Sequence, residues 1–176
     1  MKSDVIIINN QMEDFSEALK IAKKTATYEK LASKNALRVQ LITEEMLSLA
    51  RIVACADSIS FWIETDGKKF VYHLSSKVVM NQEKKAELLS AATSHKNEAA
   101  NSFLGKLRDI FENAMLSDAD HSNDIPDDIM ADLANHEISD GEWDGYERSV
   151  LHRLADEIKI GIHGGIVDMT VLKNME

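Results

Sequence analysis

The sequence holds only one cysteine and one proline among 176 residues, and it lacks any long apolar run. Because Cys55 stands alone, no disulfide can form within the chain, and its place in an apolar helical pattern is typical of a buried structural thiol. No stretch approaches the roughly 18 apolar residues that cross a membrane. The first residues also lack the apolar core of a secretory signal. We therefore expect a cytoplasmic chain that contacts no membrane.

The common catalytic and phosphate-binding motifs are missing as well. The seven glycines are scattered, and the sequence has no Gly-x-Ser-x-Gly elbow, no Walker-type phosphate loop and no Gly-x-Gly-x-x-Gly fingerprint. None of the six histidines stands at zinc-protease spacing or pairs with the cysteine at the spacing of a metal site. These absences exclude the common hydrolase, P-loop and dinucleotide-binding classes, and they predict no transition-metal site.

Basic residues are absent from one long part of the chain. The formal net charge is −10, and the segment Ser117–Asp144 alone has ten Asp or Glu residues without a Lys or Arg. A nucleic-acid backbone requires a clustered basic face, so we expect no nucleic-acid partner. The acidic segment can instead dock a basic protein through contacts that salt weakens.

The acidic segment resembles a calcium-binding loop only in its alternating carboxylates. Asn123 stands where an EF-hand requires glycine for a sharp turn, and Ile129 stands where a bidentate glutamate would close the site. Apolar residues around Pro126 keep the segment from being purely solvated. We expect a mobile acidic excursion with a short helix over about residues 117–144, and no calcium site.

The apolar pattern predicts one α+β domain over residues 1–176. A hydrophobic content of 44% is enough for one sizeable core. The strongest signal is a long helix over residues 35–56, in which apolar residues recur at alternating spacings of three and four. These residues are Val39, Ile42, Met46, Leu49, Val53 and Ala56. The other predicted helices span residues 14–31, 82–92, 98–115 and 143–154.

Short β-branched or aromatic runs next to turn residues predict the strands. The first strand covers Val5–Ile8, and two antiparallel strands cover residues 59–64 and 69–74 around the turn Thr65-Asp66-Gly67-Lys68. The clearest hairpin joins residues 157–162 and 166–172 through His163-Gly164-Gly165. We expect a two-layer α/β sandwich with helices on one face of a mostly antiparallel sheet.

This order of elements, together with the run Leu41-Ile42-Thr43-Glu44-Glu45-Met46-Leu47-Ser48-Leu49-Ala50, resembles the GHKL (histidine-kinase-like) ATPases. In size the chain is similar to the anti-sigma-factor serine kinases of that family. Their long helix carries Glu-x-x-x-Asn, in which the glutamate polarises a water or hydroxyl and the asparagine holds the magnesium that bridges the phosphates. Both side chains must lie one turn apart on one helix face. The resemblance covers nearly the whole chain by element order, and it implies ATP or ADP with magnesium as the cofactor.

Glu45 best matches the family's glutamate, because Leu47 and Ala50 then also fall where the family has similar residues. The asparagine position is then occupied by Leu49. If Glu44 is aligned instead, that position is Ser48, which reaches magnesium poorly or through water. The metal ligand is missing in both alignments, so the resemblance implies weak or absent catalysis.

The family's two other nucleotide motifs are fragmentary. The Asp-x-Gly-x-Gly turn that reads adenine belongs near His73–Gln82, where the sequence has neither the aspartate nor the glycines. The glycine-rich lid over the phosphates belongs before Glu98, where the chain has Ser94, Lys96 and Asn97. A helix start with a lysine and hydroxyls can hold an anion, because its free backbone N–H groups point toward it.

The implied function is a degenerate ATP-binding regulatory domain, with Glu45 near the metal or attacking group and Ser48 as an outer-sphere partner. Ser94 and Lys96 would lie near the phosphates, and Asn97 is a further candidate for nucleotide binding. One alternative is a regulatory scaffold that binds no nucleotide and docks a basic partner through the acidic segment. Another is an active serine kinase, which requires the missing magnesium and adenine contacts. Glu45 and Lys96 also fit an ordinary surface role, since charged side chains are common at helix edges and starts.

Overall fold

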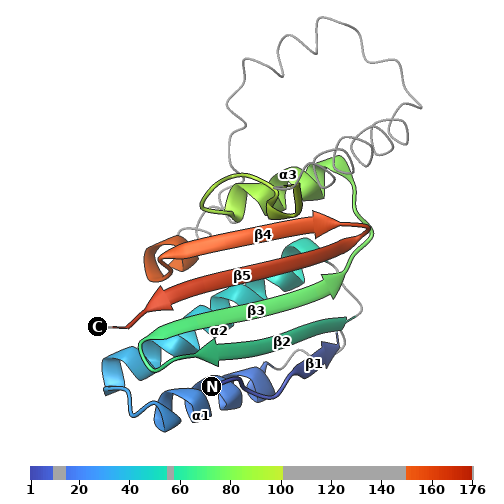
Figure 1. Cartoon of the computed structure of the whole chain (residues 1–176). Helices are drawn as coiled ribbons and strands as arrows, with labels where there is room; N and C mark the ends of the chain where they lie inside the picture. Colours follow the sequence, from blue (N-terminus) through green and yellow to red (C-terminus); the bar gives the residue numbers. More distant parts are fainter. Residues whose placement is uncertain (10–14, 55–57, 101–149, 176) are drawn as a thin grey trace, which may run out of the picture.

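The computed structural model describes residues 1–9, 15–54, 58–100 and 150–175 (Figure 1). Its centre is a five-stranded antiparallel sheet in the order β1-β2-β3-β5-β4. The strands are β1 (Ile6–Asn9), β2 (Ser58–Thr65), β3 (Lys69–Lys77), β4 (Glu157–His163) and β5 (Ile166–Asn174). The helices are α1 (Ser16–Tyr28), α2 (Ser33–Ala54), α3 (Gln82–Ala91) and the 3-10 helix η1 (Glu98–Ala100), and residues 150–154 are also helical. The predicted α+β class is confirmed.

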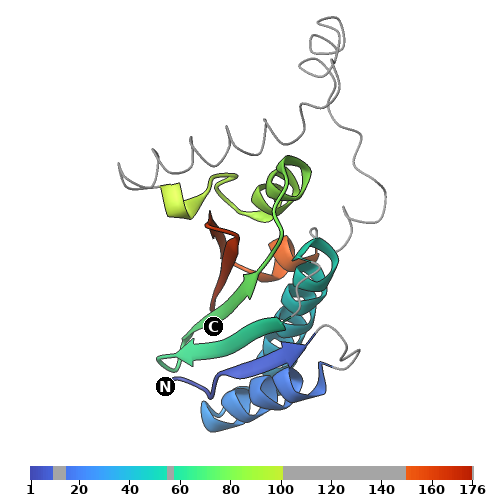
Figure 2. The same cartoon turned by 90° about the vertical axis from the view of Figure 1, so that its right-hand side faces the viewer.

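The helices α1 and α2 lie together on one face of the sheet (Figure 2). Helix α1 contacts β2, and α2 contacts β3. Helix α3 lies toward the other edge of the sheet, where it contacts both β4 and α2 (Figure 1). The short helix over residues 150–154 adds Leu151 to the same core.

The two faces of the sheet differ because side chains alternate along each strand. In β2 and β3, Phe61, Ile63, Phe70 and Tyr72 are fully buried toward the helices. The side chains between them remain partly exposed on the opposite face. The predicted hairpin of β2 and β3 is confirmed, and Gly67 takes a positive φ of 100° in its turn, a conformation that favours glycine.

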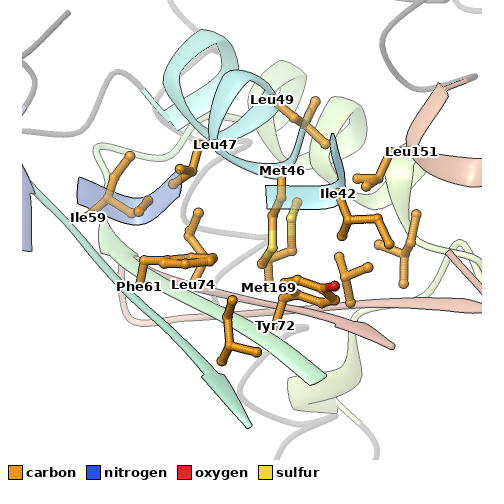
Figure 3. Packing of buried hydrophobic residues seen from close by; sticks show 14 of the residues in the cluster. Ile42, Met46, Leu47, Leu49, Ile59, Phe61, Tyr72, Leu74, Leu151 and Met169 are labelled. Carbon is orange, nitrogen blue, oxygen red and sulfur yellow. The ribbon is translucent and has the colours of Figure 1, made fainter. Parts of the chain in front are cut away.

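The core is built where α2 crosses the sheet. Figure 3 shows Ile42 and Met46 of α2 lying over Tyr72 of β3 and Met169 of β5. These four side chains have at most 1% of their surface exposed. The predicted periodicity of the long helix is therefore confirmed through its first four apolar positions, from residue 39 to residue 49, which are all buried.

The C-terminal hairpin forms as predicted, with Gly164 and Gly165 at φ values of 56° and 72°. Two successive residues with positive φ fit a two-residue hairpin turn whose twist matches that of the strands. The order of the strands is a finding that the sequence pattern did not predict. Strand β5 lies between β3 and β4, so β4 is the edge strand.

Two predicted helices and the acidic excursion fall largely outside the described residues. Of the helix predicted over residues 98–115, the described part is the 3-10 helix η1. Of the helix predicted over residues 143–154, residues 150–154 are described and are helical. The predicted excursion at residues 117–144 lies outside the described residues.

Replacing Met46 with alanine will test how far the fold depends on α2. We expect Met46→Ala to lower the free energy of unfolding by about 2–5 kcal/mol, because it opens a cavity at the centre of the core. Leu37→Ala, on the same helix but 57% exposed, should change it by less than about 0.5 kcal/mol. Urea unfolding followed by circular dichroism measures both, and equal losses in the two variants would contradict this account of the core.

Candidate functional site

The first group of predicted site residues lies in the middle of α2. Glu45 and Ser48 are half-buried, whereas Glu44 is exposed. Leu49 belongs to the hydrophobic core with 5% of its surface exposed. The position one turn after Glu45 is therefore filled by an aliphatic side chain, which has no oxygen or nitrogen to offer a metal ion.

In the segment between β3 and α3, the polar contacts of Val78 and Asn81 hold the chain in place. The backbone N–H of Val78 donates to the carbonyl oxygen of Gly165 at 2.7 Å. Asn81 is the N-cap of α3, and its side-chain oxygen accepts a hydrogen bond from the backbone N–H of Lys84 at 2.8 Å. Val79 is 89% exposed. The sequence has no aspartate here, so this turn offers no carboxylate to an adenine amino group.

The second group of predicted residues lies along the outer edge of β4. The side chain of Asn97 is almost fully buried, with 7% of the residue exposed. Its oxygen accepts from the backbone N–H of Ile162 at 2.8 Å and from that of Ala99 at 3.1 Å. Its amide nitrogen donates to the carbonyl oxygen of Ile162 at 2.9 Å. Asn97 thus satisfies both backbone groups of an edge-strand residue.

Thr93 makes a similar pair of contacts farther along the same strand. Its backbone N–H donates to the carbonyl oxygen of Ile158 at 2.9 Å, and its hydroxyl oxygen accepts from the Ile158 N–H at 2.8 Å. Together with Asn97 it holds the chain after α3 against β4. An uncovered sheet edge is a template for pairing with other chains, so these contacts protect the edge at β4.

Ser94 and Lys96 lie between these two anchors and are exposed. The hydroxyl of Ser94 donates to Glu98 Oε1 at 3.4 Å and accepts from the Lys96 backbone N–H at 3.3 Å. His95 between them has a positive φ of 51°, which turns the chain. The lysine side chain is therefore presented to solvent on a short, tightly turned loop.

The structure places the predicted residues in two separate parts of the fold. Glu45 and Ser48 belong to the helical layer, whereas Ser94, Lys96 and Asn97 follow the outer edge of β4. Helix α3 contacts both α2 and β4. Within the described residues, no group of three or more His, Cys, Asp or Glu side chains is arranged to hold a metal ion.

Sequence reasoning missed a cluster on the sheet face that α1 and α2 leave uncovered. We call Lys2, Trp62, Glu64 and His73 the Trp62 cluster. The rings of Trp62 and His73 stack with centroids 4.8 Å apart and planes 9° apart, and Lys2 Nζ lies 5.0 Å from the Trp62 centroid. Lys2 Nζ lies 3.1 Å from Glu64 Oε1, to which Trp62 Nε1 also donates at 3.2 Å. Alternation along β2 and β3 places Trp62, Glu64 and His73 on one face, but their contacts depend on the strand register. Lys2 precedes β1 and reaches the cluster through an isolated antiparallel bridge to Glu64.

The ionisation of the Trp62 cluster follows from its contacts. Hydrogen bonds from Lys2 and then Trp62 lower the pKa of Glu64, which keeps this carboxylate charged. Burial lowers the pKa of His73, against the opposing charge of Glu64, whose Oε2 lies 3.7 Å from the imidazole Nε2. His73 Nε2 has no hydrogen-bond partner among the described residues. The cluster therefore pairs a charged carboxylate with a neutral imidazole.

A serine, an aspartate and a histidine also meet on this face, but their order is not that of a catalytic triad. The Ser75 hydroxyl donates directly to Asp168 Oδ1 at 2.6 Å. His163 Nδ1 lies 3.8 Å from Asp168 Oδ2, on the other side of the carboxylate. A nucleophilic serine must donate to the imidazole that removes its proton. The arrangement therefore supports cross-strand pairing and not acyl transfer.

The comparisons with known proteins assign no family to the chain. No family model matches the sequence, and no curated protein is significantly similar to it. Among the described residues, no helix is both long and apolar enough to cross a membrane.

Replacing Asn97 will show whether its contacts with β4 stabilise the fold. We expect Asn97→Ala to lower the free energy of unfolding by about 1–3 kcal/mol, because it leaves buried backbone groups of Ile162 without partners. Lys96→Ala, one residue away and exposed, should change it by less than about 0.5 kcal/mol. Chemical unfolding, with hydrogen exchange of the Ile162 amide, measures the effect; an unchanged exchange rate in Asn97→Ala would count against this role.

The Trp62 cluster predicts a pH dependence. We expect His73 to titrate below its ordinary value of 6.5, and Glu64→Gln to lower its pKa further by removing the charge that favours imidazolium. The unfolded chain binds a proton at His73 more readily than the native protein does, so this residue makes stability fall as pH drops below about 6.5. NMR titration of the ring protons provides the measurement, and a midpoint at or above the ordinary value would refute the assignment.

Proposed function

We propose that this chain is a regulatory domain of GHKL-like architecture that binds a purine nucleotide weakly and does not transfer its phosphate efficiently. The architecture is supported by the order of elements, in which a strand and two helices precede a hairpin and a final antiparallel hairpin closes the sheet. Support also comes from α2, the helix that carries Glu45, because it packs across that sheet. Strand β4 pairs with β5 over its whole length, from Glu157 to His163.

The observation that carries the loss of catalysis is the burial of Leu49. A GHKL enzyme requires a magnesium ligand one turn after its glutamate, and here that position belongs to the apolar core. The alternative pair Glu44 and Ser48 offers magnesium a neutral hydroxyl in place of the family's carboxamide oxygen, which reaches the ion poorly or through water. In phosphoryl transfer, magnesium helps to position the phosphates and stabilises the charge that develops on them. Without a good ligand for the ion, both contributions are weakened.

The roles of the remaining residues follow from their positions. Glu45 and Ser48 are half-buried on α2, where they would lie near the nucleotide phosphates or the attacking group. Ser94 and Lys96 are exposed on the loop beside β4, where the lysine can approach an anion. Asn97 contributes by fixing this loop against Ile162, since its side chain already bonds to the backbone of β4.

A second candidate function is that of a scaffold which binds no nucleotide and docks a basic protein through the acidic segment. It is favoured by the distribution of charge, because Ser117–Asp144 has ten carboxylates and no basic residue. Such docking requires no bound nucleotide and weakens with salt. The two candidates therefore differ in their response to nucleotide.

Thermal unfolding with ATP or ADP, with and without magnesium, tests the proposed function. We expect millimolar nucleotide to stabilise the protein, by about 1.4 kcal/mol when its concentration is ten times Kd, and we expect magnesium to add nothing. Ser48→Asn should make the stabilisation depend on magnesium, since it supplies a carboxamide one turn after Glu44, whereas the matched control Ser48→Ala should not.

Two outcomes would overturn parts of this proposal. If no nucleotide stabilises the protein at millimolar concentration, nucleotide binding is refuted and the scaffold function is favoured. If the unmodified chain shows magnesium-dependent stabilisation together with rapid ATP turnover, the proposed loss of catalysis is wrong.

A further inference from the structure

One face of α1 is a stripe of basic and aromatic side chains, which we call the α1 lysine stripe. Lys20, Lys23, Lys24, Thr27 and Tyr28 recur at helical spacing and together line a surface hollow of about 500 Å³. All five residues are exposed, and Tyr28 has 67% of its surface in contact with solvent. The opposite face of the helix is buried through Ala18, Ala22, Thr25 and Ala26.

The negative charge of the chain is concentrated in one long segment. Residues 101–149 hold 3 Lys or Arg and 13 Asp or Glu, whereas the rest of the chain holds 17 of each. The rest of the chain is therefore balanced, and the net charge of −10 belongs to residues 101–149. Around the α1 lysine stripe, the only carboxylate on the exposed face of α1 is Glu17, which pairs with Lys20 at 2.7 Å.

We propose that the α1 lysine stripe is a docking surface for the chain's own acidic segment, residues 117–144. The segment supplies ten carboxylates for the lysines. It also supplies Ile125, Ile129 and Met130, which can pack on the ring of Tyr28 and on the aliphatic stems of the lysines. Single exposed ion pairs contribute little, but several of them together with apolar contacts form a multivalent interface.

The length of the chain allows this docking. Helix α1 contacts β2 near one edge of the sheet, whereas the segment after α3 leaves along β4 at the other edge. Five strands at about 4.8 Å spacing make the sheet about 20 Å wide. Residues 101–116 span about 24 Å as a helix, at about 1.5 Å per residue, and more where the chain is extended. The acidic segment can therefore reach α1 of the same molecule.

The same molecule is a better occupant than a second copy. A segment tethered at both ends has an effective concentration near its binding surface of the order of millimolar. Docking between copies must instead occur at the concentration of the free protein and against the repulsion of two chains with net charge −10. The stripe also remains occupied whether or not a nucleotide binds, so this inference is independent of the nucleotide proposal.

A spin label in the acidic segment tests the proposal on the full chain. The label is attached to Ser122→Cys in a Cys55→Ser background, and amide signals are compared with the label oxidised and reduced. We expect the α1 signals from Lys20 to Tyr28 to lose intensity at low salt. They should recover at about 0.5 M salt. The Debye length is about 10 Å at 0.1 M salt and is shorter at 0.5 M, so the attraction between the lysines and the carboxylates is more strongly screened.

A matched pair of charge-reversal variants assigns the effect to the stripe. Lys20→Glu, Lys23→Glu and Lys24→Glu together should abolish the intensity loss in α1. The control, Lys77→Glu with Arg153→Glu and Lys159→Glu, makes the same change in net charge at exposed positions outside α1 and the β2–β3 turn and should retain the loss. If the first triple variant fails to fold, Lys→Gln at its three positions provides the same test.

Three outcomes would overturn the proposal. The first is an α1 spectrum that does not change between oxidised and reduced label at low salt. The second is an intensity loss that survives charge reversal in the stripe. The third is a loss of the same size when spin-labelled protein is mixed with a separate isotope-labelled copy that carries no spin label, because that result would assign the docking to a second molecule.

Discussion

The packing of α2 across β3 and β5 is the interaction on which the rest of the structure depends. Ile42 and Met46 lie over Tyr72 and Met169, which come from strands far apart in the sequence (Figure 3). Burial of this apolar surface is the main force that holds the sheet and the helices together. Since α2 and α1 cover one face only, the other face is left to polar and aromatic side chains such as those of the Trp62 cluster (Figure 2).

Features with a local cause could be predicted from the sequence. The long helix follows from the spacing of its apolar residues, and both hairpins follow from glycines where the turns require positive φ. The alternation in β2 and β3 also follows from a period of two. Each of these signals lies within a few residues of the structure that it specifies, so the elements and the α+β class can be predicted from the sequence.

The strand order and the roles of the candidate residues could not be predicted, because they depend on contacts between distant parts of the chain. Nothing near β5 indicates that it joins β3, and nothing near Asn97 indicates that its amide bonds to Ile162. A residue type that can hold an anion can equally satisfy the backbone of an edge strand. The resemblance of Glu45 to a catalytic glutamate likewise depends only on residue identity, which the sequence gives. The burial of Leu49 depends on how α2 packs in the fold.

The pairing of β3 with β5 also has a consequence for the order of events during synthesis. Ser75 and Asp168 are 93 positions apart, yet they are neighbours across these two strands. Strand β3 therefore emerges from the ribosome with one side unpaired and stays so until most of the remaining chain has been translated. Pairings between such distant residues slow folding, so the growing chain exposes an aggregation-prone strand during this interval, and chaperones that shield extended apolar segments would act on it there.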